Sequence, residues 1–264
     1  MELLLANHPF ECMTCEKAGA CKLADYAYRY GVKETPFKGE KYCYAIDESN
    51  PFISRDLNKC ILCGACVRAC EEMTGQDNLS YLNRGYHRKA TTAGDVDYID
   101  SDCVFCGQCV AVCPTGALTE KSMKGLGRRW EIERVRTTCP FCGTGCNFDL
   151  AVKDKKIIGV LSNPDSPVNG RSLCIKGRFG WDFIYNENRL TTPLIKKDGK
   201  FEQASWDEAY DLIAKRLNEI KAQYGPDSFA ALSSARCTNE ENYLVQKFTR
   251  AAMGTNNVDH CART

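Results

Sequence analysis

One cysteine pattern occurs twice in this chain and constrains its fold more than any other feature. Residues 60–70 read C-x2-C-x2-C-x3-C, and residues 103–113 repeat that spacing and are followed by Pro114. Three cysteines two residues apart bring three sulfurs to one short loop, while the fourth cysteine points elsewhere. The chain therefore contains an internal duplication built around sulfur ligands.

The doubled spacing predicts two clusters of four iron atoms, because it resembles that of a two-cluster bacterial ferredoxin, in which the fourth cysteine of each set ligates the other cluster. We expect one 4Fe-4S cluster on Cys60, Cys63, Cys66 and Cys113. We expect the second on Cys103, Cys106, Cys109 and Cys70. Zinc sites are the alternative, but they usually pair two C-x2-C motifs a dozen or more residues apart, and neither set has that form.

A third set lies near the start of the chain and reads H-x3-C-x2-C-x5-C. Its candidate ligands are His8, Cys12, Cys15 and Cys21. The alternative is an ordinary surface histidine, but these three cysteines otherwise lack a fourth ligand. A neutral imidazole in place of a thiolate removes one negative charge, so we expect His8 to raise the reduction potential of its cluster, as in Rieske centres.

A fourth set reads C-x2-C-x3-C-x27-C and comprises Cys139, Cys142, Cys146 and Cys174. Gly143 and Gly145 give the backbone freedom to bend tightly around a cluster. Zinc is a more serious alternative for this set taken alone, and three sets upstream favour a fourth 4Fe-4S cluster. Three cysteines remain, and we expect buried or semi-buried free thiols at Cys43, Cys237 and Cys261.

Composition supports reduced thiols. Eighteen of the 264 residues are cysteine, whereas a disulfide scaffold is normally short, secreted and above about 8% cysteine. No signal segment precedes His8, so we expect a cytoplasmic protein. The longest uncharged stretches fall short of the roughly 18 apolar residues of a membrane span, and 35 basic residues balance 34 acidic ones. Membrane and nucleic-acid functions are therefore not expected.

The pattern of elements predicts an α+β, multi-unit iron–sulfur protein. We expect a His/Cys3 cluster unit, a two-cluster ferredoxin-like unit, a linker, a small β-rich 4Fe-4S domain, and the truncated start of an α/β domain. Their bounds are 1–45, 46–119, 120–136, 137–190 and 191–264. Apolar runs predict short helices at 3–6 and 23–30, and alternation predicts a β-hairpin of strands 148–152 and 157–161.

The last of these units begins with a helix start signal. Ser205 and Glu208 form a capping box, and the helix should stop at Gly225-Pro226. We expect a strand at 229–232, a second helix at 238–253, and another strand from Asn257. This β-α-β opening belongs to a larger α/β domain, because one helix cannot bury both faces of a parallel sheet. Neither a G-x-G-x-x-G after a strand nor a G-x-x-x-x-G-K-[ST] occurs.

The order of the four sets resembles the large subunit of molybdenum- or tungsten-dependent formate dehydrogenases of the NAD(P)-linked, cytoplasmic kind. The resemblance extends to the sequence LCIKGRFG at 173–180 and to NEENY at 239–243. The segment 254–264 is similar to the one that leads into the metal-ligating selenocysteine or cysteine of that family, whose proteins belong to the molybdopterin oxidoreductases.

The resemblance implies an oxidoreductase with two kinds of cofactor. Four 4Fe-4S clusters would carry electrons between a molybdenum or tungsten bis-molybdopterin guanine dinucleotide, present in the full-length enzyme, and a flavin- or NAD(P)-binding or hydrogenase-type partner subunit or ferredoxin. Lys176 would lie between the last cluster and the pterin, and Asn257 and Arg263 would border the pterin. Catalytic residues are not expected within the chain, because the metal ligand would come after Thr264.

Two departures from the family pattern bear on this interpretation. Only eleven residues precede Cys12, too few for the plant-type 2Fe-2S domain that the family usually carries, and the family continues far past Thr264. Selenocysteine is encoded by UGA, which is also a stop codon. We therefore expect UGA after Thr264, and a 264-residue form that transfers electrons but does not oxidise formate.

Two other classes of function compete. The large iron–sulfur subunit of respiratory complex I is similar through the same four motifs, and iron-only hydrogenases share the first three. A hydrogenase should lack the set from Cys139 to Cys174, and the complex I subunit should lack the run 239–264. A stand-alone electron carrier also fits, since no general base, nucleophile or open metal site is evident in the sequence.

Overall fold

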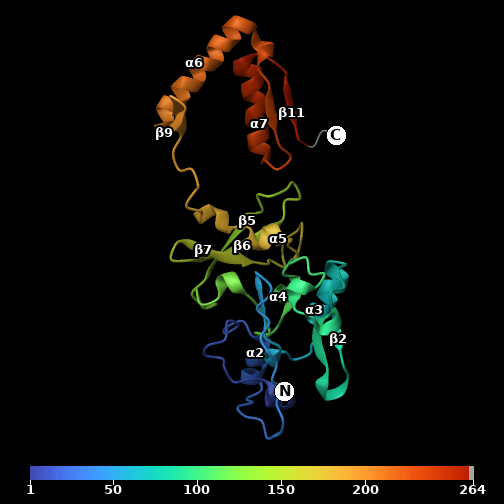
Figure 1. Ribbon diagram of the computed structural model, residues 1–264. Helices are drawn as coiled ribbons and strands as arrows, with labels where there is room; N and C mark the ends of the chain where they lie inside the picture. Colours follow the sequence, from blue (N-terminus) through green and yellow to red (C-terminus); the bar gives the residue numbers. More distant parts are fainter. Residues whose placement is uncertain (262–264) are drawn as a thin grey trace. The chain divides into compact units, whose positions relative to one another are not determined.

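The computed structural model describes residues 1–261 and combines short helices with small sheets (Figure 1), which confirms the expected mixture of α and β elements. The α-helices are α1 (Glu2–Asn7), α2 (Lys22–Arg29), α3 (Ala65–Arg68), α4 (Gln108–Val112), α5 (Ile175–Phe179), α6 (Trp206–Tyr224) and α7 (Asn239–Lys247). The strands are β1 (Ile53–Arg55), β2 (Leu79–Leu82), β3 (Lys89–Thr92), β4 (Leu118–Glu120), β5 (Glu133–Thr138), β6 (Asn147–Lys153), β7 (Lys156–Leu161), β8 (Leu194–Lys197), β9 (Lys200–Gln203), β10 (Ala231–Ser233) and β11 (Val258–His260).

The chain divides into two compact units. Unit 1 consists of Met1–Cys139 and Cys146–Trp181, and unit 2 of Pro140–Gly145 and the residues from Asp182 onward. Within residues 1–261, no helix has both the length and the apolar character that a membrane span needs. Each unit is described by itself.

The core of unit 1 joins parts of the chain that are far apart in sequence. It contains Ile53, Leu79, Tyr98, Cys109, Cys113, Ala117, Leu118 and Phe179. Phe179 belongs to α5, and its ring stacks on Phe52 with centroids 4.6 Å apart and an interplanar angle of 10°. Offset stacking of this kind adds to the apolar area that the two rings bury. The helix that follows Cys174 is therefore anchored in the core of the cysteine repeat.

The two cysteine repeats fold into matching loops, which we call the first loop (60–66) and the second loop (103–109). Leu62 and Phe105 occupy the same place in each loop and have φ of 55° and 53°. Gly64 and Gly107 follow two residues later with φ of 75° and 71°. Left-handed φ costs about 1–2 kcal/mol at a residue with a side chain. The shared strain at Leu62 and Phe105 shows that both loops are held in one specific conformation.

A three-stranded antiparallel sheet of order β5-β6-β7 completes unit 1. Its hairpin β6-β7 confirms the strands expected at 148–152 and 157–161. Asp154 and Lys155 both have positive φ, 50° and 62°. This is the geometry of a two-residue type I′ turn, whose twist matches that of the flanking strands.

Strand β5 lies partly in the stretch 120–136, where the sequence suggested a linker. For residues 133–136 that interpretation is wrong, because they pair with β6. Arg134 and Arg136 are two residues apart and therefore point to the same face of the strand. There they lie 3.5 Å and 3.6 Å from the carboxylate oxygens of the buried Asp149. The basic residues that suggested a solvated segment thus compensate a buried acid.

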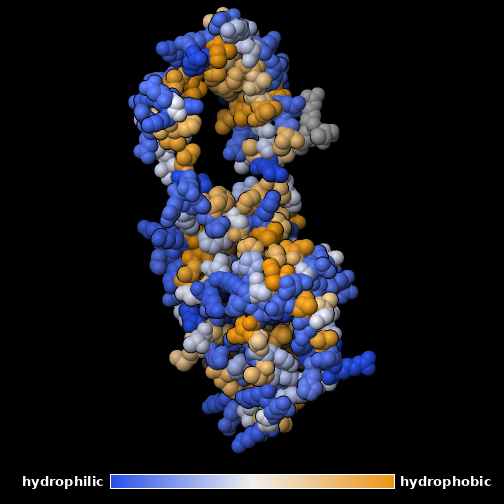
Figure 2. Space-filling model, viewed as in Figure 1, coloured by the Kyte–Doolittle hydropathy of each residue, from blue (hydrophilic) through white to orange (hydrophobic). Residues whose placement is uncertain are grey.

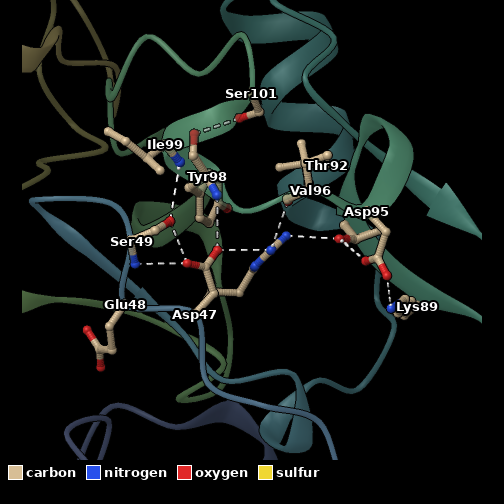
Figure 3. A network of polar contacts seen from close by, with 12 residues as sticks. Asp47, Glu48, Ser49, Lys89, Thr92, Asp95, Val96, Tyr98, Ile99 and Ser101 are labelled. Atoms are coloured by element: carbon tan, nitrogen blue, oxygen red, sulfur yellow. Dashed lines mark hydrogen bonds and ion pairs between the residues drawn. The ribbon is translucent and has the colours of Figure 1, made fainter.

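A polar network holds the segment before β1 against the segment after β3 (Figure 3). Asp47 accepts hydrogen bonds from Ser49 Oγ (2.6 Å) and from the Tyr98 N–H (3.1 Å). Its Oδ2 lies 2.9 Å from Arg55 Nη2, and both side chains are almost fully buried. Arg55 also donates to Thr91 Oγ1 (2.9 Å) and lies 4.7 Å above the Tyr98 ring. The network therefore fixes Tyr98, which is 1% exposed.

Unit 2 begins its long helix where the sequence predicts. Capping boxes are present at both helix starts, Ser205 with Glu208 at α6 and Thr238 with Glu241 at α7. The π-helical residues Phe248–Met253 continue α7 as far as Gly254. Strand β10 precedes α7 in the sequence and β11 follows it, and the two strands pair in parallel. This confirms the β-α-β arrangement. Figure 2 shows hydrophobic residues at the surface of this unit along α6 and α7.

Candidate metal centres

The first cysteine quartet lines one cavity. Cys60, Cys63 and Cys66 come from the first loop and the start of α3, and Cys113 comes from the end of α4. The cavity has a volume of about 30 Å³. Its other walls are largely apolar: Leu57, Ile61, Leu79, Ala90, Ala117 and Leu118. The structure thus brings together the four residues that the sequence grouped, including the one from the other repeat.

The second quartet lines a second cavity. Cys103, Cys106 and Cys109 come from the second loop and the start of α4, and Cys70 comes from the π-helical turn Ala69–Met73. This cavity measures about 20 Å³. Within residues 1–261, no group of three or more His, Cys, Asp or Glu side chains is drawn together around a single metal ion. The four cysteines of each quartet instead line a cavity of their own.

The donor chemistry of both cavities fits an iron–sulfur cluster. The Leu62 N–H donates to Cys60 Sγ and the Phe105 N–H donates to Cys103 Sγ, each at 3.4 Å. Such N–H···S bonds stabilise a negatively charged sulfur. Burial raises the pKa of Cys60 to about 11 and that of Cys66 to about 12. Thiols so buried become good ligands when a metal lowers the cost of their deprotonation.

The histidine set has an unsatisfied nitrogen. His8 follows α1, and its Nδ1 is buried without a hydrogen-bond partner in the described structure. Burial and then the charge of Lys59 lower the pKa of His8, so the imidazole is in the neutral form that binds metals. Burial raises the pKa of Cys21, to which the nearby Cys15 and Cys12 thiols also contribute. A metal ligand at Nδ1 would satisfy this atom.

The histidine set lies against the first cavity. The Lys22 N–H at the start of α2 donates to the Pro114 carbonyl (3.0 Å), directly after Cys113. A Cβ on Gly116 would lie 2.7 Å from Cys15 Sγ, so this position has room only for glycine. Lys17 is close enough to Cys113, Cys21 and Cys15 to interact with all three, although burial lowers its pKa. No sequence signal marks Gly116, because its neighbour comes from another part of the chain.

Tyr98 lies between the two cavities. Its ring lines both of them, as does Leu79. Its Oη is 3.8 Å from Cys109 Sγ, one of the second quartet, and its side chain is fully buried. Burial, and next the neighbouring Cys109, raise the pKa of Tyr98 well above its usual value. The phenol therefore remains protonated and can donate to the sulfur. Sequence reasoning did not identify this residue.

The fourth set is divided between the two units. Cys139, Cys146 and Cys174 belong to unit 1, and Cys142 belongs to the segment 140–145 of unit 2. The Cys139 N–H donates to the Cys146 carbonyl (2.8 Å), and both residues pack against Phe148, Val160 and Leu173. A Cβ on Gly177 in α5, three residues after Cys174, would lie 3.6 Å from Cys139 Sγ. In unit 2, Cys142 Sγ lies 3.3 Å from Thr144 Oγ1.

The remaining predicted positions differ in outcome. Cys43, Cys237 and Cys261 are exposed, so the expectation of buried or semi-buried thiols is wrong for all three. Lys176 is an exposed residue of α5. The Asn257 amide donates to the carbonyls of Asp227 and Phe229 and so joins the start of β11 to the segment after α6. Arg263 and Thr264, at the expected border of the pterin and of the selenocysteine codon, lie outside the described residues.

Four families of known proteins match successive parts of the chain. Residues 1–36 match the NADH-ubiquinone oxidoreductase-G iron-sulfur binding region, and residues 59–117 match the 4Fe-4S dicluster domain. Residues 132–186 match the molybdopterin oxidoreductase Fe4S4 domain, and residues 189–264 match molybdopterin oxidoreductase. These matches support 4Fe-4S and molybdopterin cofactors.

Similar proteins include "Probable oxidoreductase YjgC" of Bacillus subtilis (strain 168), which is 35% identical over the whole of this chain. "Putative formate dehydrogenase SAB2186c" of Staphylococcus aureus (strain bovine RF122 / ET3-1) is 33% identical, also over the whole chain. The chain spans 31% of the length of each relative. A chain of an NAD+-reducing [NiFe]-hydrogenase in the H2-reduced state has a TM-score of 0.44 and 31% identity, and the match covers 48% of this chain and 54% of that one.

The relatives align along the full chain, and the matched regions follow one another from residue 1 to residue 264. Two successive regions, which begin at residues 132 and 189, carry the molybdopterin oxidoreductase description. Residues 132–186 and 189–264 therefore match two successive domains of the molybdopterin oxidoreductase family.

Proposed function

We propose that this chain is the electron-transfer segment of a formate dehydrogenase and that its ligand sets hold four 4Fe-4S clusters. The clusters would be carried by His8 with Cys12, Cys15 and Cys21, by the two exchanged quartets, and by Cys139, Cys142, Cys146 and Cys174. When bound, such clusters pass single electrons between neighbouring centres. The free thiols that line the two cavities suit a reducing compartment such as the cytoplasm.

The observation that carries the proposal is the order of the ligand residues that belong to unit 1. Gly116 and Lys17 connect the histidine set to the first cavity. Tyr98 and Leu79 are shared by the first and second cavities. The buried Arg178 belongs to the helix that follows Cys174, and its Nε donates to the Cys106 carbonyl of the second loop. Within unit 1, ligands of each set therefore lie near ligands of the next one, which is the arrangement that stepwise electron transfer needs.

The terminal reactions belong to the longer protein. We propose that electrons come from formate at a molybdenum or tungsten bis-molybdopterin guanine dinucleotide, which Lys176, Asn257 and Arg263 would approach. They would leave through a flavin- or NAD(P)-binding or hydrogenase-type partner subunit, or through ferredoxin. The support is the molybdopterin oxidoreductase match at 189–264 and a relative with the name "Putative formate dehydrogenase SAB2186c".

Metal analysis of the anaerobically prepared protein tests the cluster proposal. We expect about sixteen iron and sixteen sulfide for these 264 residues, with visible absorption that dithionite bleaches. Stoichiometric zinc with little iron would contradict it. Replacing His8 with Cys should lower the reduction potential of one cluster, because a thiolate adds one negative charge. Unchanged electron paramagnetic resonance signals in both His8→Cys and His8→Ala would contradict the ligand assignment.

The match of residues 1–36 favours a second candidate, an iron–sulfur subunit like that of respiratory complex I. The electron donor distinguishes the two. In the full-length protein, formate should reduce the clusters under the first proposal. Reduction by NADH through a partner subunit, with no response to formate, would favour the second.

A further inference from the structure

Arg178 is a buried cation in the core of unit 1. It belongs to α5, its side chain is 2% exposed, and burial lowers its pKa. A buried charge is costly unless it is paired or fully hydrogen-bonded. Within residues 1–261, however, the Arg178 guanidinium forms no ion pair: no carboxylate oxygen lies within about 4 Å of its nitrogens.

The hydrogen bonds of the Arg178 side chain go to neutral acceptors. Its Nε donates to the Cys106 carbonyl (2.9 Å), and its Nη2 donates to Gln108 Oε1 (3.3 Å) and Ser162 Oγ (3.0 Å). Glu120 and Arg178 line one cavity. Burial raises the pKa of Glu120 to about 7. Glu120 interacts electrostatically with the guanidinium and favours its charged form, but it forms no ion pair with it.

The position of Arg178 connects two ligand sets. A Cβ on Gly107 in the second loop would lie 2.3 Å from Arg178 Cδ, so the arginine packs directly on that loop. The Arg178 N–H donates to the Cys174 carbonyl (3.1 Å), one helical turn back. Besides Glu120, the sulfurs of Cys106, Cys109 and Cys174 interact electrostatically with the guanidinium and favour its charged form. Cysteines of two ligand sets are thus neighbours of this guanidinium.

We propose that Arg178 is a positioning residue that places a fixed positive charge between the second-loop set and the fourth set and makes them easier to reduce. The inference rests on the proposed cluster ligation. Reduction adds one electron, received from the neighbouring centre, and Arg178 itself exchanges neither electron nor proton. A nearby positive charge stabilises the more negative, reduced state.

The test is a redox titration by electron paramagnetic resonance of the cluster-loaded protein that carries this chain. Arg178→Met should lower the reduced-to-oxidised ratio of at least one cluster about tenfold at fixed potential, which corresponds to about 59 mV for one electron. Arg178→Lys keeps the charge and should restore most of the ratio. Arg84→Met, which removes the same charge from an exposed position, should change nothing.

A second pair of variants acts without removing the arginine. Ser162→Asp places a carboxylate beside Arg178 Nη2 and should lower the same potential, whereas the neutral Ser162→Asn should not. Unchanged potentials in Arg178→Met at full iron content would overturn the inference, as would equal shifts in Arg178→Met and Arg178→Lys. If Arg178→Met fails to load iron, equal potentials in the two Ser162 variants would overturn it. Absence of iron from the unaltered protein would instead contradict the proposed function.

Discussion

The first and second loops have the same backbone and different surroundings. Leu62 and Phe105 share left-handed φ, and each donates its N–H to the first sulfur of its loop at 3.4 Å. The first loop is covered at Gly64 by the phenol of Tyr81, whose Oη donates to the Leu62 carbonyl (3.3 Å).

The second loop is covered by a cation. Arg178 packs on Gly107 and donates to the Cys106 carbonyl. The second loop is also the more buried: Cys106 is half-buried and Cys109 buried, whereas their counterparts Cys63 and Cys66 are exposed and half-buried. The repeated sequence therefore determines the shape of each loop, whereas distant segments determine the electrostatic environment of its sulfurs.

Removal of the fourth ligands should change the two loops most. Cys113→Ser should remove the cluster of the first loop, and Cys70→Ser should remove that of the second, because each cavity receives its fourth cysteine from the other repeat. Each variant should lose about four iron atoms, with a different set of electron paramagnetic resonance signals missing. Cys43→Ser, at an exposed position outside the sets, is the control. Loss of the opposite cluster in either variant would refute the exchange.

The covering residues predict unequal costs for a methyl group at the two glycines. A Cβ at Gly107 would meet the buried Arg178 Cδ at 2.3 Å, whereas a Cβ at Gly64 would meet the ends of two side chains, Tyr81 Oη at 2.4 Å and Arg68 Nη1 at 3.2 Å. Overpacking costs about 1–3 kcal/mol beyond the left-handed strain, so Gly107→Ala should lower the free energy of unfolding more. Denaturant titrations followed by circular dichroism measure this. Gly125→Ala has the strain alone, since nothing lies within 4 Å of that position. Equal losses at all three glycines would disprove the packing difference.

The stability that Asp47 contributes to the network around Tyr98 should depend on pH. Burial acts to raise the pKa of Asp47, but hydrogen bonds from Ser49 and Tyr98 and the charge of Arg55 outweigh it and lower the pKa. A lowered folded-state pKa contributes stability that is present above the unfolded value of 3.8 and lost as pH falls through the folded value.

Asp47→Asn should therefore reduce stability at pH 6 and show less further loss than the unaltered protein below pH 4. The loss should affect both clusters equally, because Tyr98 lines both cavities. Cluster absorbance during urea titration at several pH values provides the measurement. Asp97→Asn, an exposed carboxylate nearby, should follow the unaltered protein. A pH profile that Asp47→Asn leaves unchanged would count against this explanation.

The smallest expected effect separates the two phenols. Tyr98→Phe removes the hydroxyl 3.8 Å from Cys109 Sγ. Reduction of the second-loop cluster should become less favourable by about 1 kcal/mol, so its potential should fall. Tyr81→Phe removes a hydrogen bond to a carbonyl and should shift the first-loop potential less. Redox titration of both variants compares them. A larger shift in Tyr81→Phe would reverse the assignment.

The features that could be predicted from sequence are those that neighbouring residues determine. Cysteine spacing predicted the grouping of both quartets, and Ser205 and Thr238 marked helix starts because a capping box needs only four consecutive residues. The β6-β7 hairpin followed from strict alternation around a short turn. Local chemistry is sufficient in each of these cases.

The features that could not be predicted depend on contacts between distant segments. Strand β5 looked like a linker, because its arginines showed no partner until Asp149 paired with them across the sheet. Tyr98 is an ordinary tyrosine in the sequence, and its place between two cavities results from the network of Asp47 and Arg55. Arg178 lies within a family motif, but its neighbour Gly107 is far away in the chain.

The placement of Cys113 in the first cavity has a consequence for biosynthesis. A ribosome adds roughly 5–20 residues per second, so the first loop emerges several seconds before its fourth ligand. During that interval Cys60, Cys63 and Cys66 are three exposed thiols on a nascent chain, open to oxidation or to capture of other metals. Under the proposed ligation, neither cluster can be completed until both repeats have been translated. Delivery of iron and sulfide would then have to follow translation of the whole duplication.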